Sequence, residues 1–262
     1  LSKVNQAILD DKPEDLGPQS VLTMEDVSKV RLEELSKKGE MVRVKFRNRV
    51  LQRFVRAMSG RDDFEDNMDF GKTFMGYTSI KQLQYILDPE RSIEPKDLNA
   101  VKKDISIVTD PIFMREFRAS IWPVVKVNCA SASCHGAPAG VGGFKLFNTS
   151  GRDVKVLYTN FIILAGTTNK SEARMLDRDT PEESLLLEYL IPKSLAKHPH
   201  PTTKKSMRIL FKDKNQPAYK MINGWISSLA TPGYPNYRLD YKPPFGMKLK
   251  LSGGGTLRDR IR

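Results

Sequence analysis

Apolar residues between positions 24 and 59 change from helical to strand spacing and back again. Thr23, with Asp26 three residues later, predicts a helix start ahead of MEDVSKVRLEELSKK. Over residues 41–46 apolar and basic side chains alternate, which is typical of a half-buried strand with one basic face. From Arg47 onward the apolar positions recur at helical spacing, so we expect a second helix there.

Four later segments carry start signals of helices, either a hydroxyl residue or a proline in the first turn. They are SIKQLQYIL from Ser79 and ending before Pro89; IFMREFRASIW after Asp110-Pro111, with a restart or kink at Pro123; SLLLEYLI after the capping-box sequence Thr180-Pro181-Glu182-Glu183; and AYKMINGWISSL after Pro217. The last of these is strongly amphipathic, and its predicted core face is Ala218, Met221, Ile222, Trp225, Ile226 and Leu229.

Three stretches have the composition of irregular structure. Residues 1–20 are polar and interrupted by prolines and a glycine, which predicts an extended arm. Residues 62–69 are rich in Asp and Glu, but their spacing does not match a calcium-binding loop, so we expect a solvated loop. Residues 231–262 are rich in Pro, Gly, Lys and Arg, which predicts an irregular basic tail that wraps a surface or contacts a partner.

Composition narrows the class of protein. The 262 residues are 39% hydrophobic and the mean hydropathy is −0.44, values typical of a soluble globular chain. No apolar run reaches the length of a membrane span, and the opening residues lack a signal pattern, as expected of a processed mature chain. The net charge of +12 favours acidic partners. The basic face of this strand and helix lacks interleaved exposed aromatic residues, so nucleic acid is not expected as a partner.

The sequence CASASCHG contains the only two cysteines, Cys129 and Cys134, followed directly by His135. It resembles the C-x-x-C-H signal for covalent haem, in which both cysteines form thioethers and the histidine binds iron. The loop is two residues longer here, but its four intervening residues are small and leave room for a porphyrin. We therefore predict one covalently attached haem, with His135 as an iron ligand.

Three other interpretations of the cysteine pair stay open. The pair could form a disulfide, although so short a loop gains little from cross-linking. It could bind zinc, but the remaining histidines, His198 and His200, are separated only by Pro199, which is poor ligand spacing. Cys129 and Cys134 could also be two unrelated buried thiols.

An electron carrier fills the second axial position of its haem iron, commonly with Met or His. The candidates are His200, His198, Met207 and Met175. Both histidines precede a proline, which holds them in extended backbone and suits the presentation of a side chain. We therefore expect a second histidine ligand, and two imidazoles predict a lower reduction potential than His/Met ligation.

The segment from about residue 104 to 230 resembles a planctomycete-type mono-haem c cytochrome domain. The matching stretches are DISIVTDPIFMREFRASIWPVV, CASASCHG, GGFKLF, LYTNFIIL, TPEESLLLEYLIP, HPHP and INGWISSL. The leader region of such proteins is resembled by two N-terminal stretches, LTMEDVSKVRLEEL and VRVKFRNRVLQRFV. The resemblance implies haem attachment at Cys129, Cys134 and His135, and a distal ligand at His200, with His198 as the alternative. The chain departs from small c cytochromes in its four-residue spacer and in having His-Pro where they have Met-Pro.

These observations together predict a mainly α fold in three parts. We expect a smaller α+β N-terminal region over 1–104, a cytochrome c-like helical haem domain over 105–230, and an extended basic tail over 231–262. The resemblance implies an electron-transfer protein rather than an enzyme.

Haem attachment to cysteine takes place outside the cytoplasm, so an exported, periplasmic protein is expected. Its predicted partner is an acidic redox protein, or the other subunits of a redox complex. Two alternatives remain: a haem enzyme or gas sensor with a displaceable distal ligand, and a non-haem basic binding module with a Cys129–Cys134 disulfide or zinc.

Overall fold

The computed structural model describes residues 21–35, 40–59, 68–88, 93–138, 140–148, 151–201, 209–229, 234–239, 241–244 and 247–251. The expected N-terminal arm, most of the acidic segment, Pro89 and the candidate ligand Met207 lie outside these ranges. The last residues of the acidic segment were expected to be loop, but they begin a helix at Met68.

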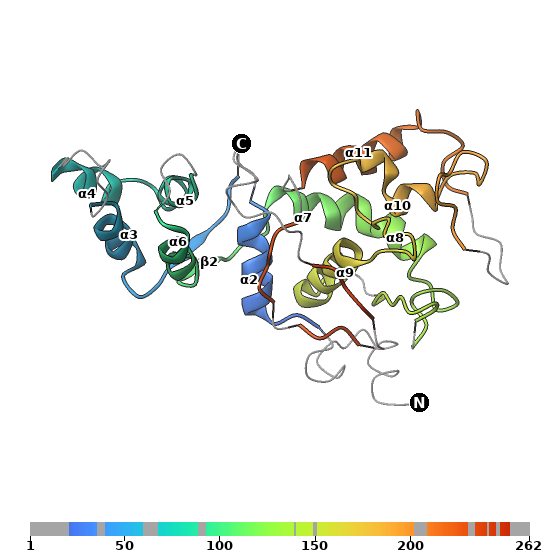
Figure 1. Ribbon diagram of the computed structural model, residues 1–262, viewed down its shortest axis with the longest axis horizontal. Helices are drawn as coiled ribbons and strands as arrows, with labels where there is room; N and C mark the ends of the chain where they lie inside the picture. The colour runs from blue at the N-terminus through green and yellow to red at the C-terminus, as the bar shows by residue number, and fades with distance from the viewer. Residues whose placement is uncertain are drawn as a thin grey trace.

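The described chain is mostly helical with one small antiparallel sheet, as the mainly α prediction requires (Figure 1). One end of the molecule is built from α3 (Val50–Ser59), α4 (Met68–Met75), α5 (Ser79–Leu87) and α6 (Pro95–Lys102). The other end contains α7 (Ile112–Glu116), α8 (Trp122–Asn128), α9 (Val154–Gly166), α10 (Leu185–Glu188) and α11 (Pro217–Ser228). Between them lie α2 (Met24–Glu33) and β2 (Ile105–Ile107), which pairs with β1 (Val44–Phe46).

The first core joins the small sheet to α3–α6. Val44 lies opposite Ile107 and Phe46 opposite Ile105 in the sheet, and Phe54 and Phe74 pack at 5.2 Å between ring centroids. The predicted alternation is present, since Val42 is buried while the arginines and lysine beside it are exposed, although the strand starts at Val44 rather than at residue 41.

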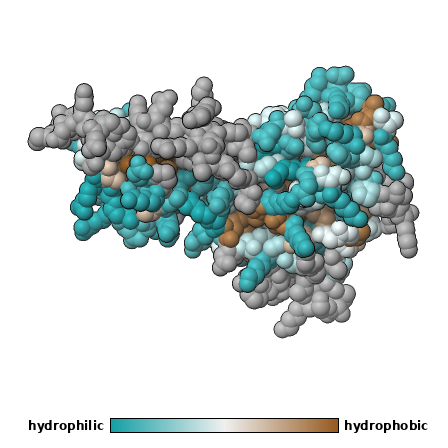
Figure 2. All heavy atoms as spheres, in the orientation of Figure 1, coloured by the Kyte–Doolittle hydropathy of each residue, from teal (hydrophilic) through white to brown (hydrophobic). Residues whose placement is uncertain are grey.

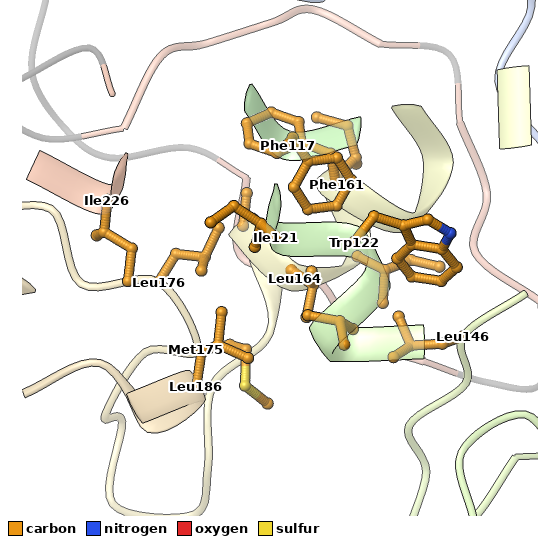
Figure 3. Close-up of a cluster of buried hydrophobic side chains, with 14 of the residues drawn as sticks. Phe117, Ile121, Trp122, Leu146, Phe161, Leu164, Met175, Leu176, Leu186 and Ile226 are labelled. Atoms are coloured by element: carbon orange, nitrogen blue, oxygen red, sulfur yellow. The ribbon is translucent and has the colours of Figure 1, made fainter. Parts of the chain in front are cut away.

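The second core surrounds α9, in which every residue from Val156 to Gly166 is buried. This helix has no amphipathic pattern because apolar residues occur on every side of it, and its two buried polar side chains, Thr159 and Asn160, are hydrogen-bonded. Phe117 and Trp122 pack in this core from the long helical segment that begins at α7, together with Leu176 and with Leu186 of α10 (Figure 3). Phe117 stacks on Trp225 of α11 at 5.3 Å between ring centroids.

Several predicted helix signals are confirmed. The capping box of Thr23 and Asp26 is present, and α5 and α11 begin at Ser79 and Pro217. The helix predicted after Asp110-Pro111 is continuous from α7 to α8, with one π-helical turn immediately before Pro123. The wider π-helical turn accommodates Pro123, which has no main-chain N–H to donate within the helix.

Two local predictions are wrong, and a third is confirmed only in part. Asp110 does not cap α7; its carboxylate instead binds Arg31 and Arg118, each at 2.6 Å. The sequence from Thr180 forms a 3₁₀ turn without a side-chain cap, and α10 behind it has only four residues. On α11 the predicted core residues Ile222, Trp225, Ile226 and Leu229 are buried, whereas Ala218 and Met221 are exposed and Tyr219 is buried instead.

The described part of the tail is irregular and lies along the second core. Tyr234, Tyr237 and Met247 are buried, and the main-chain N–H of Lys250 donates to the carbonyl of Gly166 at the end of α9. Much of the surface seen in Figure 2 is hydrophilic. None of the described helices is long and apolar enough to cross a membrane.

Candidate functional site

The cysteine-containing loop begins where α8 ends and folds back on itself. The N–H of His135 donates to the carbonyl of Cys129 at 3.0 Å, and the N–H groups of Cys134 and Gly136 donate to the carbonyl of Ser131. A Cβ on Gly136 would lie 2.0 Å from the carbonyl oxygen of Ala130, so only glycine allows this approach. The closed loop brings Cys129 beside Cys134 and His135 although four residues lie between the two cysteines.

The ring of His135 is oriented by the glycine-rich turn that follows it. Its Nδ1 lies 3.1 Å from the carbonyl oxygen of Val141 and 3.3 Å from that of Phe144, whose ring packs against the imidazole at 4.7 Å. Gly142 and Gly143 have φ values of 63° and 73°, which let the chain reverse within this turn. Carbonyl oxygens only accept, so Nδ1 carries the proton and Nε2 keeps its lone pair.

His200 lies directly against His135 although 65 positions separate them in the sequence. Their ring centroids are 6.1 Å apart, and Tyr189 packs on the other edge of His200 at 4.8 Å. The Nδ1 of His200 donates to the carbonyl of Pro201 at 2.8 Å, which again leaves the lone pair on Nε2. Within the described residues, neither Nε2 has a hydrogen-bond partner.

The electrostatic surroundings keep His135 neutral. Burial lowers the pKa of His135, the two carbonyl contacts oppose this, and the neighbouring His200 lowers it further. A neutral imidazole is the form that binds a metal ion. His135 therefore has both the tautomer and the charge state of a metal ligand.

The remaining ligand candidates are placed differently. His198 is half-buried, and its main-chain N–H donates to Oε2 of Glu188 at 2.7 Å; no ring contact joins it to His135 in the described structure. Met175 is buried in the second core beside Leu176 (Figure 3). Of the three candidates that the structure describes, His200 is the one whose side chain contacts His135.

Both cysteines are free thiols in the structure. Burial raises the pKa of Cys129 to about 12, with a smaller contribution from the neighbouring Cys134, so Cys129 is protonated at neutral pH. Zinc is bound by thiolates and needs three or four protein ligands. In the ranges that the structure describes, no group of three or more Cys, His, Asp or Glu side chains is placed to hold a metal ion.

A haem iron needs fewer protein ligands than zinc does, because the porphyrin would supply four nitrogens and the chain only two ligands. His135 and His200 would be these two ligands, and the fold places their ring centroids 6.1 Å apart. The residues present therefore fit a haem better than a zinc ion.

Sequence reasoning missed two residues that shape the loop of His200. Glu188 is buried and accepts from the N–H of His198, while Tyr189 contacts the His200 ring. The available signal was a single carboxylate inside the apolar run LLLEYL. A buried charged group needs a partner, and here the partner is the loop that carries the second histidine.

Comparison of the chain with models of protein families, with curated proteins and with solved structures gives no match. The resemblance to a c cytochrome domain therefore stays a prediction. Function has to be inferred from the two histidines, the cysteine loop and their surroundings.

Proposed function

We propose that this chain is an exported c-type cytochrome that transfers single electrons through one covalently attached haem. Cys129 and Cys134 would form the thioethers, and His135 and His200 would be the axial ligands of the iron. One observation carries the proposal: the histidine that follows the second cysteine lies 6.1 Å, centroid to centroid, from a histidine 65 positions away. When bound, the haem would supply the Fe(III)/Fe(II) couple.

The surroundings of the two histidines support a carrier. The carbonyls of Val141 and Phe144 hold the proximal ring in one orientation, and Tyr189 and the Pro201 carbonyl hold the distal ring. Ligands that are fixed in advance need little rearrangement when the charge on the iron changes. Two neutral imidazoles also favour ferric iron, which predicts a low reduction potential.

The charge of the chain supports an acidic redox partner. The net charge is +12, and exposed Lys193 lies in the segment that leads to His200. Such a surface steers a negatively charged protein into a weak, salt-sensitive encounter. The partner is either a separate acidic protein or other subunits of a redox complex.

A second candidate function, a haem-based gas sensor, is favoured by the unequal support of the two ligands. Nδ1 of His135 contacts two carbonyls of a folded turn, whereas Nδ1 of His200 contacts only the carbonyl of the next residue, Pro201. The distal imidazole is therefore the easier one to displace. Binding of carbon monoxide by the native reduced protein would favour the sensor, and its absence would favour the carrier.

The proposed function is tested by producing the full chain in a host that attaches haem to cysteine. We expect a band that stains for haem on a denaturing gel, and sharp absorption bands in the reduced protein. Replacing both Cys129 and Cys134 with alanine removes the stain, whereas the control Ser133→Ala keeps it, because Ser133 is an exposed residue of the same loop. A colourless wild-type protein without stain would overturn the proposal and leave the basic binding module.

A further inference from the structure

Lys145 is a fully buried lysine beside the cysteine loop, and the proposed function does not use it. Its side chain has 0% exposure, although Lys and Glu are the residues least often enclosed in a core. An uncompensated buried ammonium is strongly unfavourable, so its presence here needs a partner and a reason.

The partners of the Lys145 ammonium are main-chain carbonyls of the loop. Nζ donates to the carbonyl of Gly136 at 3.1 Å and to that of Ala137, the two residues that directly follow His135. Two carbonyl dipoles solvate the charge without neutralising it, and neither contact is with a carboxylate. The positive charge is therefore retained inside the protein.

The neighbours of Lys145 in the chain place it at the proximal histidine. The carbonyl of Phe144 contacts Nδ1 of His135, and the N–H of Leu146 donates to the carbonyl of His135 at 2.9 Å. The N–H of Lys145 itself points to Sδ of Met247 in the tail at 3.3 Å. Phe144 and Leu146 thus contact His135 through their main chains, and the ammonium of Lys145 between them in the chain contacts the two residues that follow His135.

We infer that Lys145 is a positioning residue of the proximal side that also raises the reduction potential of the haem. This inference rests on the proposed function. A fixed positive charge in a poorly screened interior favours the less positive, ferrous state of a nearby iron. Burial lowers the pKa of Lys145 to about 8, so the group remains mostly charged at pH 7. The charge of Lys145 would therefore raise the reduction potential and offset part of the decrease that two imidazole ligands cause.

The test compares reduction midpoints of the haem-loaded full chain at pH 7. Lys145→Met keeps the length of the side chain and removes its charge, and Lys145→Gln removes the charge but can still donate to a carbonyl. The control is Lys220→Met, which removes an exposed positive charge on α11. We expect the Lys145 variants to lower the equilibrium constant for reduction about tenfold, which is about 59 mV for one electron. The control Lys220→Met should change this equilibrium constant little.

The outcomes separate this inference from the proposed function. If the wild-type chain carries no haem, the proposed function fails. If haem is bound with an unchanged spectrum, and Lys145→Met and Lys145→Gln shift the midpoint no more than Lys220→Met, Lys145 has a structural role only and the inference is overturned. Lower thermal stability alone would not support it, since any buried substitution lowers stability.

Discussion

At the scale of single residues, the main-chain carbonyls determine what the two histidines can do. The carbonyls of Val141 and Phe144 contact Nδ1 of His135, and that of Pro201 contacts Nδ1 of His200. Each imidazole is left with its Nε2 lone pair, and the two rings lie side by side. A hydrogen bond to the other ring nitrogen is the usual device that fixes the tautomer of a metal-binding histidine.

A first prediction concerns the distal ligand. Replacing His200 with alanine should open a coordination site, since the described part of its loop provides no other ring in contact with His135. The absorption spectrum should then become high-spin. His198→Ala is the matched control from the same His-Pro-His-Pro sequence and should stay low-spin. If only the His198 change gives a high-spin spectrum, the assignment is wrong. If neither does, the ligand is Met207, Met175 or another residue.

A second prediction concerns the pH dependence of stability. Burial lowers the pKa of Lys145 from 10.5 to about 8 in the folded protein. Between these values the unfolded chain keeps the proton and the folded protein loses it, so the contribution of Lys145 to the free energy of unfolding rises with pH. Urea unfolding at pH 7.5 and 9.5 measures this change.

The control for this pH effect is Lys145→Met, in which the other titrating groups are the same. The stability of the wild type relative to the variant should increase from pH 7.5 to pH 9.5. A difference that does not depend on pH would show that the lysine does not titrate in this window.

At the scale of elements, the site depends on short irregular segments supported by helices. The cysteine loop follows α8 and closes through main-chain hydrogen bonds, and the loop of His200 follows the four-residue α10. Glu188 at the end of α10 binds the N–H of His198, and Tyr189 contacts His200. Functional groups often lie on such loops when a rigid core positions them.

A third prediction addresses the closed cysteine loop. Gly136→Ala should prevent haem attachment and destabilise the protein, because the added Cβ would lie 2.0 Å from the carbonyl oxygen of Ala130. The matched control is Gly224→Ala, at an exposed position of α11 with no atom within 4 Å of the new Cβ. That change should keep the haem and stabilise the fold by about 0.5–1 kcal/mol, since alanine is the better helix former. Haem staining and thermal unfolding measure both effects, and normal haem content in Gly136→Ala would contradict the prediction.

At the scale of the whole molecule, α2 joins the two cores. Val27 and Val30 belong to the core around α9, whereas Leu32 belongs to the core of α3–α6. Charged groups on the same helix make the connection specific. Arg31 binds Asp110 at 2.6 Å, and Glu34 binds Arg178 at 2.7 Å deep in the interior.

The tail completes this arrangement. The hydroxyl of Tyr237 contacts both Glu34 and Arg178, and Arg238 donates to Glu33 of α2 and to Asn99 of α6. The described tail therefore contacts α2, the loop after α9 and an exposed residue of α6. It links parts of the chain that are far apart in the sequence.

A fourth prediction compares a buried and an exposed arginine of this arrangement. Arg178→Met leaves the carboxylate of Glu34 in the interior without its ion-pair partner and should lower the free energy of unfolding by about 3–5 kcal/mol. Arg238→Met removes a partly exposed pair with Glu33 and should cost about 1 kcal/mol or less. Urea unfolding of both variants is the measurement. Equal losses would argue against a special role for the buried cluster.

Local signals in the sequence predicted much of the helical structure correctly. Thr23 with Asp26, Ser79 and Pro217 mark helix starts that the structure has, because caps and first-turn prolines act on hydrogen bonds within a few residues. Asp110 and Thr180 carried the same type of signal and did not act as caps. For Asp110 the reason is tertiary: two arginines compete for its carboxylate.

The sequence by itself determined which residues can do chemistry: two cysteines, an adjoining histidine and only two further histidines to accompany it. Only the tertiary structure decided that His200 rather than Met175 meets His135, and that Lys145 is enclosed beneath the cysteine loop. Pairings across 65 positions depend on how α8, α9 and α10 pack. Hydrophobic spacing records which side of a helix is buried, but not what a distant loop will contact once that side is covered.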